Sequence, residues 1–155
     1  SSIDNLNYSI TSDYFTDNDF TMGTVNTKSF VLLLAQNSPR SFISGSLITL
    51  SEVLKEYNRN EFHHIYPKAF LLPQEDSLNF SINCLANFCF LSRSDNKKIG
   101  GIAPSKYRDF LPNNIEEIMI SDFCSEDELI ADDFDKFITT RSQRLKEYLD
   151  TLIQI

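Results

Sequence analysis

The feature that most constrains the fold of this chain is a long amphipathic stretch from Asp133 to Ile153. Its apolar residues recur every three or four positions, which places them on one face of a helix. Because the repeat is too short for a coiled coil, we expect the helix to pack against its own domain. The apolar face consists of Phe134, Phe137, Ile138, Leu145, Tyr148, Leu149 and Leu152.

Composition indicates one domain with a substantial core. The chain has 155 residues, 41% of them hydrophobic, including 13 Phe and 6 Tyr. This excludes disordered, collagen-like and low-complexity classes and favours a single domain over residues 1–155. The longest apolar run, Phe30 to Ala35, is too short to cross a membrane, so no membrane partner is expected. Because the chain begins without Met, we expect the C-terminal part of a longer protein or a processed chain.

The cysteines indicate the redox compartment, and the charge limits the class of partner to be expected. Cys84, Cys89 and Cys124 form no C-x-x-C pair, which excludes a zinc ribbon and a disulfide scaffold and favours the reducing cytoplasm. The net charge of −8 argues against a general nucleic-acid binder. However, residues 59–108 hold seven basic and four acidic residues, a net charge of +3. The acidic flanks either form a solvated surface or partner the basic segment.

Local patterns predict several short helices on both sides of a strand-like middle. Residues 27–36 favour a helix, and Thr49 and Glu52 form a capping box for another over residues 50–57. The flanking helical regions are residues 27–57 and 105–155, with short helices also expected over 94–100, 104–111 and 114–123. Residues 60–91 favour short strands broken by Pro67 and Pro73, with residues 83–91 the better strand candidate.

Candidate functional residues begin with the only two histidines, which are adjacent in Glu61-Phe62-His63-His64-Ile65-Tyr66-Pro67-Lys68. Downstream, eight residues separate Asn87 from Asn96. Together with Asn96-Lys97-Lys98-Ile99-Gly100 and Pro104-Ser105-Lys106-Tyr107, this pattern resembles the HNH, or ββα-metal, nuclease motif over residues 62–107. The pattern is similar to the C-terminal HNH domain of GmrSD-like restriction proteins. Residues 134–145 also resemble the closing helix of that family.

The resemblance implies a fold class and an activity. The fold would be mainly α with a small two-stranded ββα-metal insert, several short helices and a long C-terminal helix. The activity would be that of a metal-dependent endonuclease that cuts or nicks DNA in an antiphage restriction system. A ParB-like nucleotide-hydrolysing domain would precede this domain in the same protein.

The resemblance also assigns roles to four residues. His64 would be the general base, for which an ordinary imidazole pKa of about 6.5 is suited. His63 and Asn96 would hold one divalent metal ion, Mg²⁺ or Mn²⁺, although Ni²⁺ and Zn²⁺ also suit these ligands. Adjacent strand residues point to opposite faces, which allows the two histidines different tasks. Asn87 would tie the two strands together and orient the loop of His64, a role for which Asn83 is the alternative; Asn87 could equally serve a local turn.

Basic residues follow the motif and could bind DNA phosphates, which positions a backbone without specifying its sequence. For each of them a solvated surface position is the alternative. The residues are Arg93, Lys97, Lys98, Lys106 and Arg108.

Two further hypotheses remain open. With His63 and Asn96 as ligands the site has no carboxylate, which favours a catalytically inactive module that binds DNA or another domain. The third is a helical interaction domain in which the two histidines have no shared role.

Overall fold

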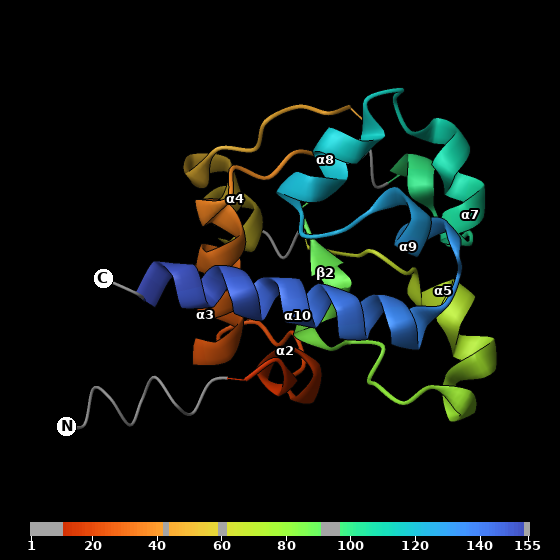
Figure 1. The fold of residues 1–155 in the computed structure, drawn as a ribbon, viewed down its shortest axis with the longest axis horizontal. Coiled ribbons are helices and arrows are strands. Elements are labelled where there is room, and N and C mark those ends of the chain that lie inside the picture. Colours follow the sequence, from red (N-terminus) through yellow and green to blue (C-terminus); the bar gives the residue numbers. More distant parts are fainter. Residues whose placement is uncertain (1–10, 42–43, 59–61, 91–96, 154–155) are drawn as a thin grey trace.

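Helix α10 (Phe134–Ile153) crosses the width of the molecule in this computed structural model, which describes residues 11–41, 44–58, 62–90 and 97–153 (Figure 1). The long C-terminal helix predicted from the sequence is therefore confirmed. Its inner face buries the predicted apolar side chains from Phe134 to Leu145. The end of the apolar stripe is not covered, since Leu152 is 41% exposed.

The remaining elements are short, and the mainly α fold class with a two-stranded insert is confirmed. Residues 97–99 are also helical, and Gly100, with φ of 57°, follows them. None of the helices in the described ranges is long and apolar enough to cross a membrane. In chain order the elements are α2 (Asp13–Asp17), α3 (Val25–Gln36), α4 (Leu50–Asn58), β1 (His63–His64), α5 (Lys68–Leu71), the 3-10 helices η1 (Leu72–Ser77) and η2 (Leu85–Asn87), β2 (Phe88–Cys89), α7 (Pro104–Tyr107), the 3-10 helix η3 (Arg108–Phe110), α8 (Ile115–Ser121) and α9 (Glu126–Ile130).

Side-chain caps set the starts of α3 and α4. Helix α3 begins two residues before the predicted position because the hydroxyl of Thr24 accepts a hydrogen bond from the backbone N–H of Thr27 (3.3 Å). At α4 the predicted capping box is confirmed. The Thr49 N–H donates to Glu52 Oε2 (3.1 Å), and the Glu52 N–H donates to Thr49 Oγ1 (3.2 Å).

The strand prediction for residues 60–91 is largely wrong. Pro67 directly precedes α5 and Pro73 lies in the first turn of η1, where a missing N–H costs nothing. Only Phe88–Cys89 of the predicted strand 83–91 is a strand. The residues before it form the turn η2, which is closed by a hydrogen bond from the Asn87 N–H to the Cys84 carbonyl (3.0 Å).

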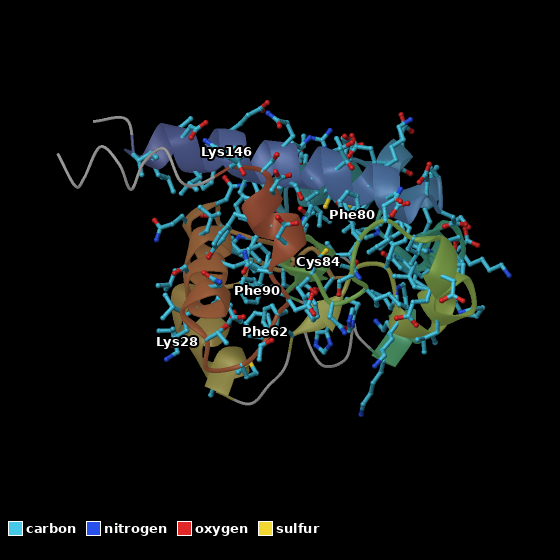
Figure 2. All side chains as sticks on the ribbon, turned by 90° about the horizontal axis from the view of Figure 1, so that it is seen from below. Lys28, Phe62, Phe80, Cys84, Phe90 and Lys146 are labelled. Carbon is cyan, nitrogen blue, oxygen red and sulfur yellow. The ribbon has the colours of Figure 1, made fainter. Side chains whose placement is uncertain are left out.

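Strand β2 lies inside the helical shell, whereas β1 is half-buried. Figure 2 shows Cys84 and Phe90 projecting into the interior between the helices, and both are fully buried. Phe20 stacks on Phe88 of β2 with ring centroids 4.4 Å apart. On the opposite side of the core, Tyr66 packs against Phe137 of α10 (4.9 Å). The hairpin is therefore held by aromatic contacts from both ends of the chain. All three cysteines are buried free thiols.

Candidate active site

A short hairpin forms the centre of the candidate site. Strands β1 and β2 pair in antiparallel fashion, with His63 opposite Cys89 and His64 opposite Phe88. The pairing continues beyond the strands, since the Ile65 N–H donates to the carbonyl of Asn87 (2.7 Å). Both histidines are thus placed by backbone pairing with the segment that follows Asn87.

Asn87 joins the loop after β1 to the start of β2. It is fully buried, and its Oδ1 accepts a hydrogen bond from the Tyr66 N–H (2.9 Å). Its Nδ2 donates to the carbonyls of Tyr66 (3.1 Å) and Ile82 (2.9 Å). This carboxamide satisfies three buried backbone groups that the two-residue strands leave without ladder partners. It contacts backbone only, so it orients the His64 loop without touching the imidazole.

Arg141 of α10 supports the same hairpin from within the core. Its side chain is fully buried, and its Nη1 donates to the carbonyls of Ala86 (2.7 Å) and Phe88 (2.8 Å), on either side of Asn87. Its Nε donates to the carbonyl of Asp122 (3.1 Å). A planar guanidinium with several donors can bond three carbonyls at once, which a lysine ammonium cannot do with the same geometry. Helix α10 therefore fixes the backbone around the candidate site.

His64 is held by a ring contact and by a hydrogen bond. Its imidazole packs on Phe88, its partner in the register, with ring centroids 4.4 Å apart. Its Nε2 lies 2.9 Å from Oδ1 of Asn83. Burial lowers the pKa of His64 below its ordinary value, the nearby charge of Lys68 lowers it further, and the bond to Asn83 opposes both effects. The ring is thus favoured in its neutral form, which a proton acceptor requires.

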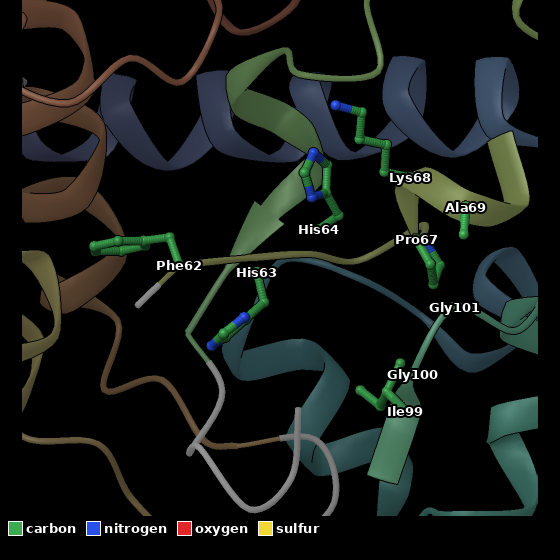
Figure 3. Close-up of a pocket in the computed structure, with 9 residues that line it drawn as sticks. All are labelled: Phe62, His63, His64, Pro67, Lys68, Ala69, Ile99, Gly100 and Gly101. Carbon is green, nitrogen blue, oxygen red and sulfur yellow. The ribbon is translucent and has the colours of Figure 1, made fainter. Parts of the chain in front are cut away.

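The two histidines point to opposite sides of β1. Figure 3 shows His64 and Lys68 on one side of the strand and His63 on the other, which is also the side of Ile99 and Gly100. Both rings line one cavity of about 240 Å³. The residues that line it are Phe62, His63, His64, Pro67, Lys68, Ala69, Ile99, Gly100 and Gly101. The segment directly after Asn96 therefore shares a cavity with both histidines.

The second predicted metal ligand, Asn96, lies outside the described residues. Within the described part of the chain, no group of three or more His, Cys, Asp or Glu side chains is arranged to hold a metal ion. His63 is thus the one proposed ligand whose position is known. It lines the cavity together with Ile99 and Gly100.

The predicted phosphate-binding residues occupy different surroundings. Arg93 lies outside the described residues, whereas Lys97, Lys98 and Lys106 are exposed. Arg108 forms an ion pair with Glu126 of α9 (2.6 Å). At this position the acidic segment does partner the basic one.

Lys68 and Arg141 are residues that the sequence interpretation did not single out. Lys68 lines the cavity beside His64, which places a cation four residues after the candidate base. That spacing was visible in the sequence, because Pro67 ends the extended segment and a following helical turn returns position 68 toward the strand. Arg141 falls on the apolar face of the predicted helix, three residues after Ile138 and four before Leu145, and a charged residue at such a position was a signal that it is buried.

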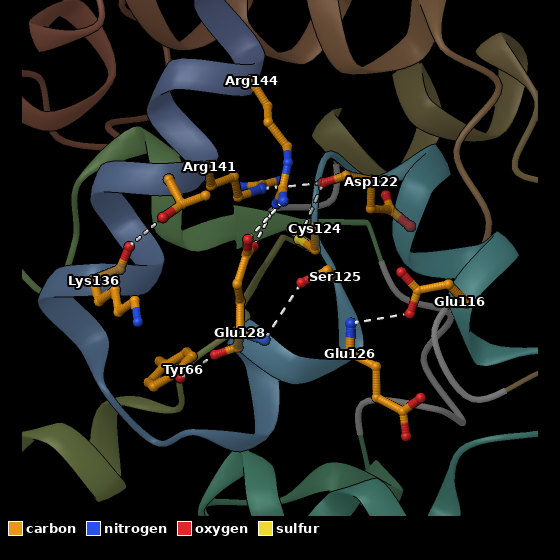
Figure 4. A network of polar contacts seen from close by, with 11 residues as sticks. Tyr66, Glu116, Asp122, Cys124, Ser125, Glu126, Glu128, Lys136, Arg141 and Arg144 are labelled. Atoms are coloured by element: carbon orange, nitrogen blue, oxygen red, sulfur yellow. Dashed lines mark hydrogen bonds and ion pairs between the residues drawn. The ribbon is translucent and has the colours of Figure 1, made fainter.

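A polar network joins α9 to α10 behind the hairpin. The Tyr66 hydroxyl donates to the carbonyls of Glu128 (3.1 Å) and Leu129 (3.0 Å). The carboxylate of Glu128 is gripped by both Nη atoms of Arg144, with 2.6 Å between Nη2 and Oε1 (Figure 4). These contacts join Tyr66 to α9 and α9 to α10, and they leave the cavity side of β1 open.

Comparisons with known proteins identified no relative of the chain. No family model, curated protein or solved structure matches the chain. The functional argument therefore rests on the geometry of the site and on the resemblance in the motif.

Proposed function

We propose that this chain is a metal-dependent endonuclease domain of the HNH type that hydrolyses DNA phosphodiesters by cutting or nicking. One observation carries the proposal: antiparallel pairing of β1 with β2 sets both histidines against one cavity while Asn87 ties the two strands. This is the arrangement that the resemblance over residues 62–107 implies. A half-buried imidazole with a lowered pKa beside a lysine suits a proton acceptor near an anionic substrate.

The chemistry assigned to these residues is a single in-line displacement. His64 takes a proton from a water molecule, and the water oxygen forms a bond to phosphorus. The bond between phosphorus and the 3′ oxygen breaks, and that oxygen takes a proton from solvent. The products are a 5′-phosphate and a 3′-hydroxyl, and the imidazolium returns its proton to solvent. General-base catalysis of this kind contributes about 10²- to 10⁴-fold to a rate.

A divalent metal ion belongs to the proposal, with His63 and Asn96 as its protein ligands. The position of His63 at the cavity wall beside residues 99 and 100 fits this assignment. When bound, the ion neutralises charge on the phosphate. Mg²⁺ and Mn²⁺ are the expected ions, and imidazole with amide oxygen also suits Ni²⁺ and Zn²⁺.

Lys68 is the first candidate for a contact to the substrate phosphate, because it lines the same cavity as His64. Lys97, Lys98 and Lys106 are exposed and suit contacts to neighbouring phosphates, as Arg93 would by its sequence position. Arg108 has to leave Glu126 to take part. With a net charge of −8, the domain steers DNA weakly by itself. We propose that the domain belongs to a cytoplasmic antiphage restriction protein. In that protein, an N-terminal ParB-like nucleotide-hydrolysing domain would supply further contacts to DNA.

A second candidate is a catalytically inactive module of the same fold that binds DNA or the neighbouring domain. It is favoured by the ligand set, since the described residues contain no cluster of three or more His, Cys, Asp or Glu side chains for a metal. The first candidate function predicts DNA cleavage and the second does not, whereas DNA binding is compatible with both.

A plasmid assay tests both candidates. Supercoiled plasmid is incubated with the chain and Mn²⁺ or Mg²⁺, alongside an EDTA control. His64→Ala removes the proposed base, and His64→Gln keeps a polar side chain of similar size in its place. Nicking or linearisation that both substitutions and EDTA abolish supports the nuclease. DNA binding without cleavage supports the inactive module. If the chain neither binds nor cleaves DNA, the result supports the helical interaction domain.

A further inference from the structure

Asn83 approaches the candidate base from the loop before η2, and its backbone is fixed independently of its side chain. Its N–H donates to Ser81 Oγ (3.1 Å), and its carbonyl accepts from the Phe20 N–H (2.7 Å). The half-buried side chain is therefore presented to Nε2 of His64 (2.9 Å) by a backbone that does not depend on that contact.

The identity of the contacting atom decides which imidazole nitrogen carries the hydrogen. A carboxamide oxygen has lone pairs and no hydrogen, so it can only accept. With Oδ1 of Asn83 as the partner, Nε2 of His64 is the donor. The neutral ring then has its lone pair on Nδ1, since one nitrogen carries the hydrogen and the other accepts. Packing on Phe88 restricts the rotation that would exchange the two nitrogens.

We propose that Asn83 is a positioning residue that holds His64 as the Nε2–H tautomer, so that Nδ1 is the atom that accepts the proton from water. The consequence for cleavage rests on the nuclease function proposed above, whereas the tautomer is a property of the folded chain. Asn83 acts on the ring, and Asn87 acts on the backbone that carries it. The two asparagines thus have separate roles.

A tautomer assignment by nitrogen NMR tests the proposal directly. The labelled, metal-free chain is studied at a pH where His64 is neutral, and His63→Gln identifies the signals, since the chain has two histidines. We expect Nε2 to have the chemical shift of a protonated nitrogen and Nδ1 that of an unprotonated one. Asn83→Ala should give a mixture of both tautomers, whereas Asn83→Asp, which keeps an acceptor oxygen, should retain the Nε2–H form. The exposed Asn113→Ala should leave the spectrum unchanged.

Cleavage kinetics give the second measurement. Loss of the acceptor in Asn83→Ala should lower kcat about 10- to 100-fold with KM changed less than about twofold, and Asn83→Asp should recover most of the rate. A wild-type Nδ1–H tautomer, or an Asn83→Ala variant with an unchanged tautomer, overturns the proposal. If Asn83→Ala does not fold, Asn83→Leu, which has a similar size and no acceptor, gives the same comparison. If the wild-type chain does not cleave DNA while the His64 tautomer responds to the substitutions of Asn83 as expected, the nuclease function is wrong. The role of Asn83 in positioning the ring then stands.

Discussion

The two sides of the β1–β2 hairpin use polar side chains in opposite ways. On the core side, Asn87 and Arg141 are fully buried and bond only to backbone groups. On the cavity side, His63, His64 and Lys68 are only partly covered and line open space. Buried polar groups that bond to backbone carbonyls and N–H groups fix the geometry of that backbone, whereas partly exposed titratable groups remain able to react. The difference separates the residues that build the site from those that would do its chemistry.

The largest effect is expected on the core side, from Asn87→Ala. The substitution leaves the Tyr66 N–H and the carbonyls of Tyr66 and Ile82 buried without their partner. We expect the free energy of unfolding to fall by roughly 2–4 kcal/mol, measured by urea denaturation. Asn113→Ala, at an exposed position, is the control and should change it by less than about 0.5 kcal/mol. Equal effects would mean that the carboxamide does not hold the hairpin.

Arg141→Met should follow in magnitude. The apolar stem remains, but the carbonyls of Ala86, Phe88 and Asp122 lose their donors. A loss of about 2–3 kcal/mol is expected in the same assay. Arg144→Met is the matched control one turn along α10, where a partly exposed ion pair with Glu128 is worth about 0.5–1 kcal/mol. A larger loss for Arg144 than for Arg141 would reverse the comparison.

A pH-dependent effect is expected from Asp122. Burial raises its pKa to about 8, although the charge of Arg141 acts in the opposite direction. Between the ordinary value of 3.8 and about 8 the folded chain binds more protons than the unfolded chain, so stability should fall as the pH rises through this range. Asp122→Asn should remove about 1–3 kcal/mol of that decline between pH 5 and pH 8. Asp109→Asn, the exposed control, should leave the decline intact, and a slope unchanged by Asp122→Asn would contradict the assignment.

The smallest effect belongs to the cavity side. The charge of Lys68 contributes to the lowered pKa of His64, so Lys68→Met should raise the titration midpoint of that ring. The measurement is an NMR titration of the metal-free chain in EDTA. Lys106→Met, the exposed control outside the cavity, should leave the midpoint in place. A fall in the midpoint after Lys68→Met would show that the lysine does not act through its charge.

Periodic patterns predicted the helices, and side-chain networks limited the prediction of the strands. Helix α10 and the capping box of Thr49 and Glu52 follow from local spacing and chemistry, and both formed as expected. The strand over residues 83–91 was predicted too long, because the carboxamide of Asn87 takes over backbone bonding that a ladder would otherwise supply.

For the site, the resemblance implied the paired strands but not the supporting residues. The resemblance placed His63 and His64 on one strand and Asn87 on a second one, and the two strands do pair, with Asn87 directly before β2. The spacing of Lys68 from His64 and the place of Arg141 on the apolar face were visible in the sequence, but the hairpin carbonyls that Arg141 bonds lie 55 and 53 residues away, and no local pattern identifies them. The predicted positions Arg93 and Asn96 lie outside the described residues, and their roles stay predictions.

The guanidinium that clamps the hairpin comes from a position 55 residues later in the chain than Ala86, whose carbonyl it binds. During synthesis, both histidines therefore emerge from the ribosome well before their clamp does. A nascent or prematurely terminated chain that stops ahead of α10 has the motif in its sequence without the framework that orders it. Assembly of the site is thus coupled to completion of the final helix, which delays any reactivity until the domain can close around its core.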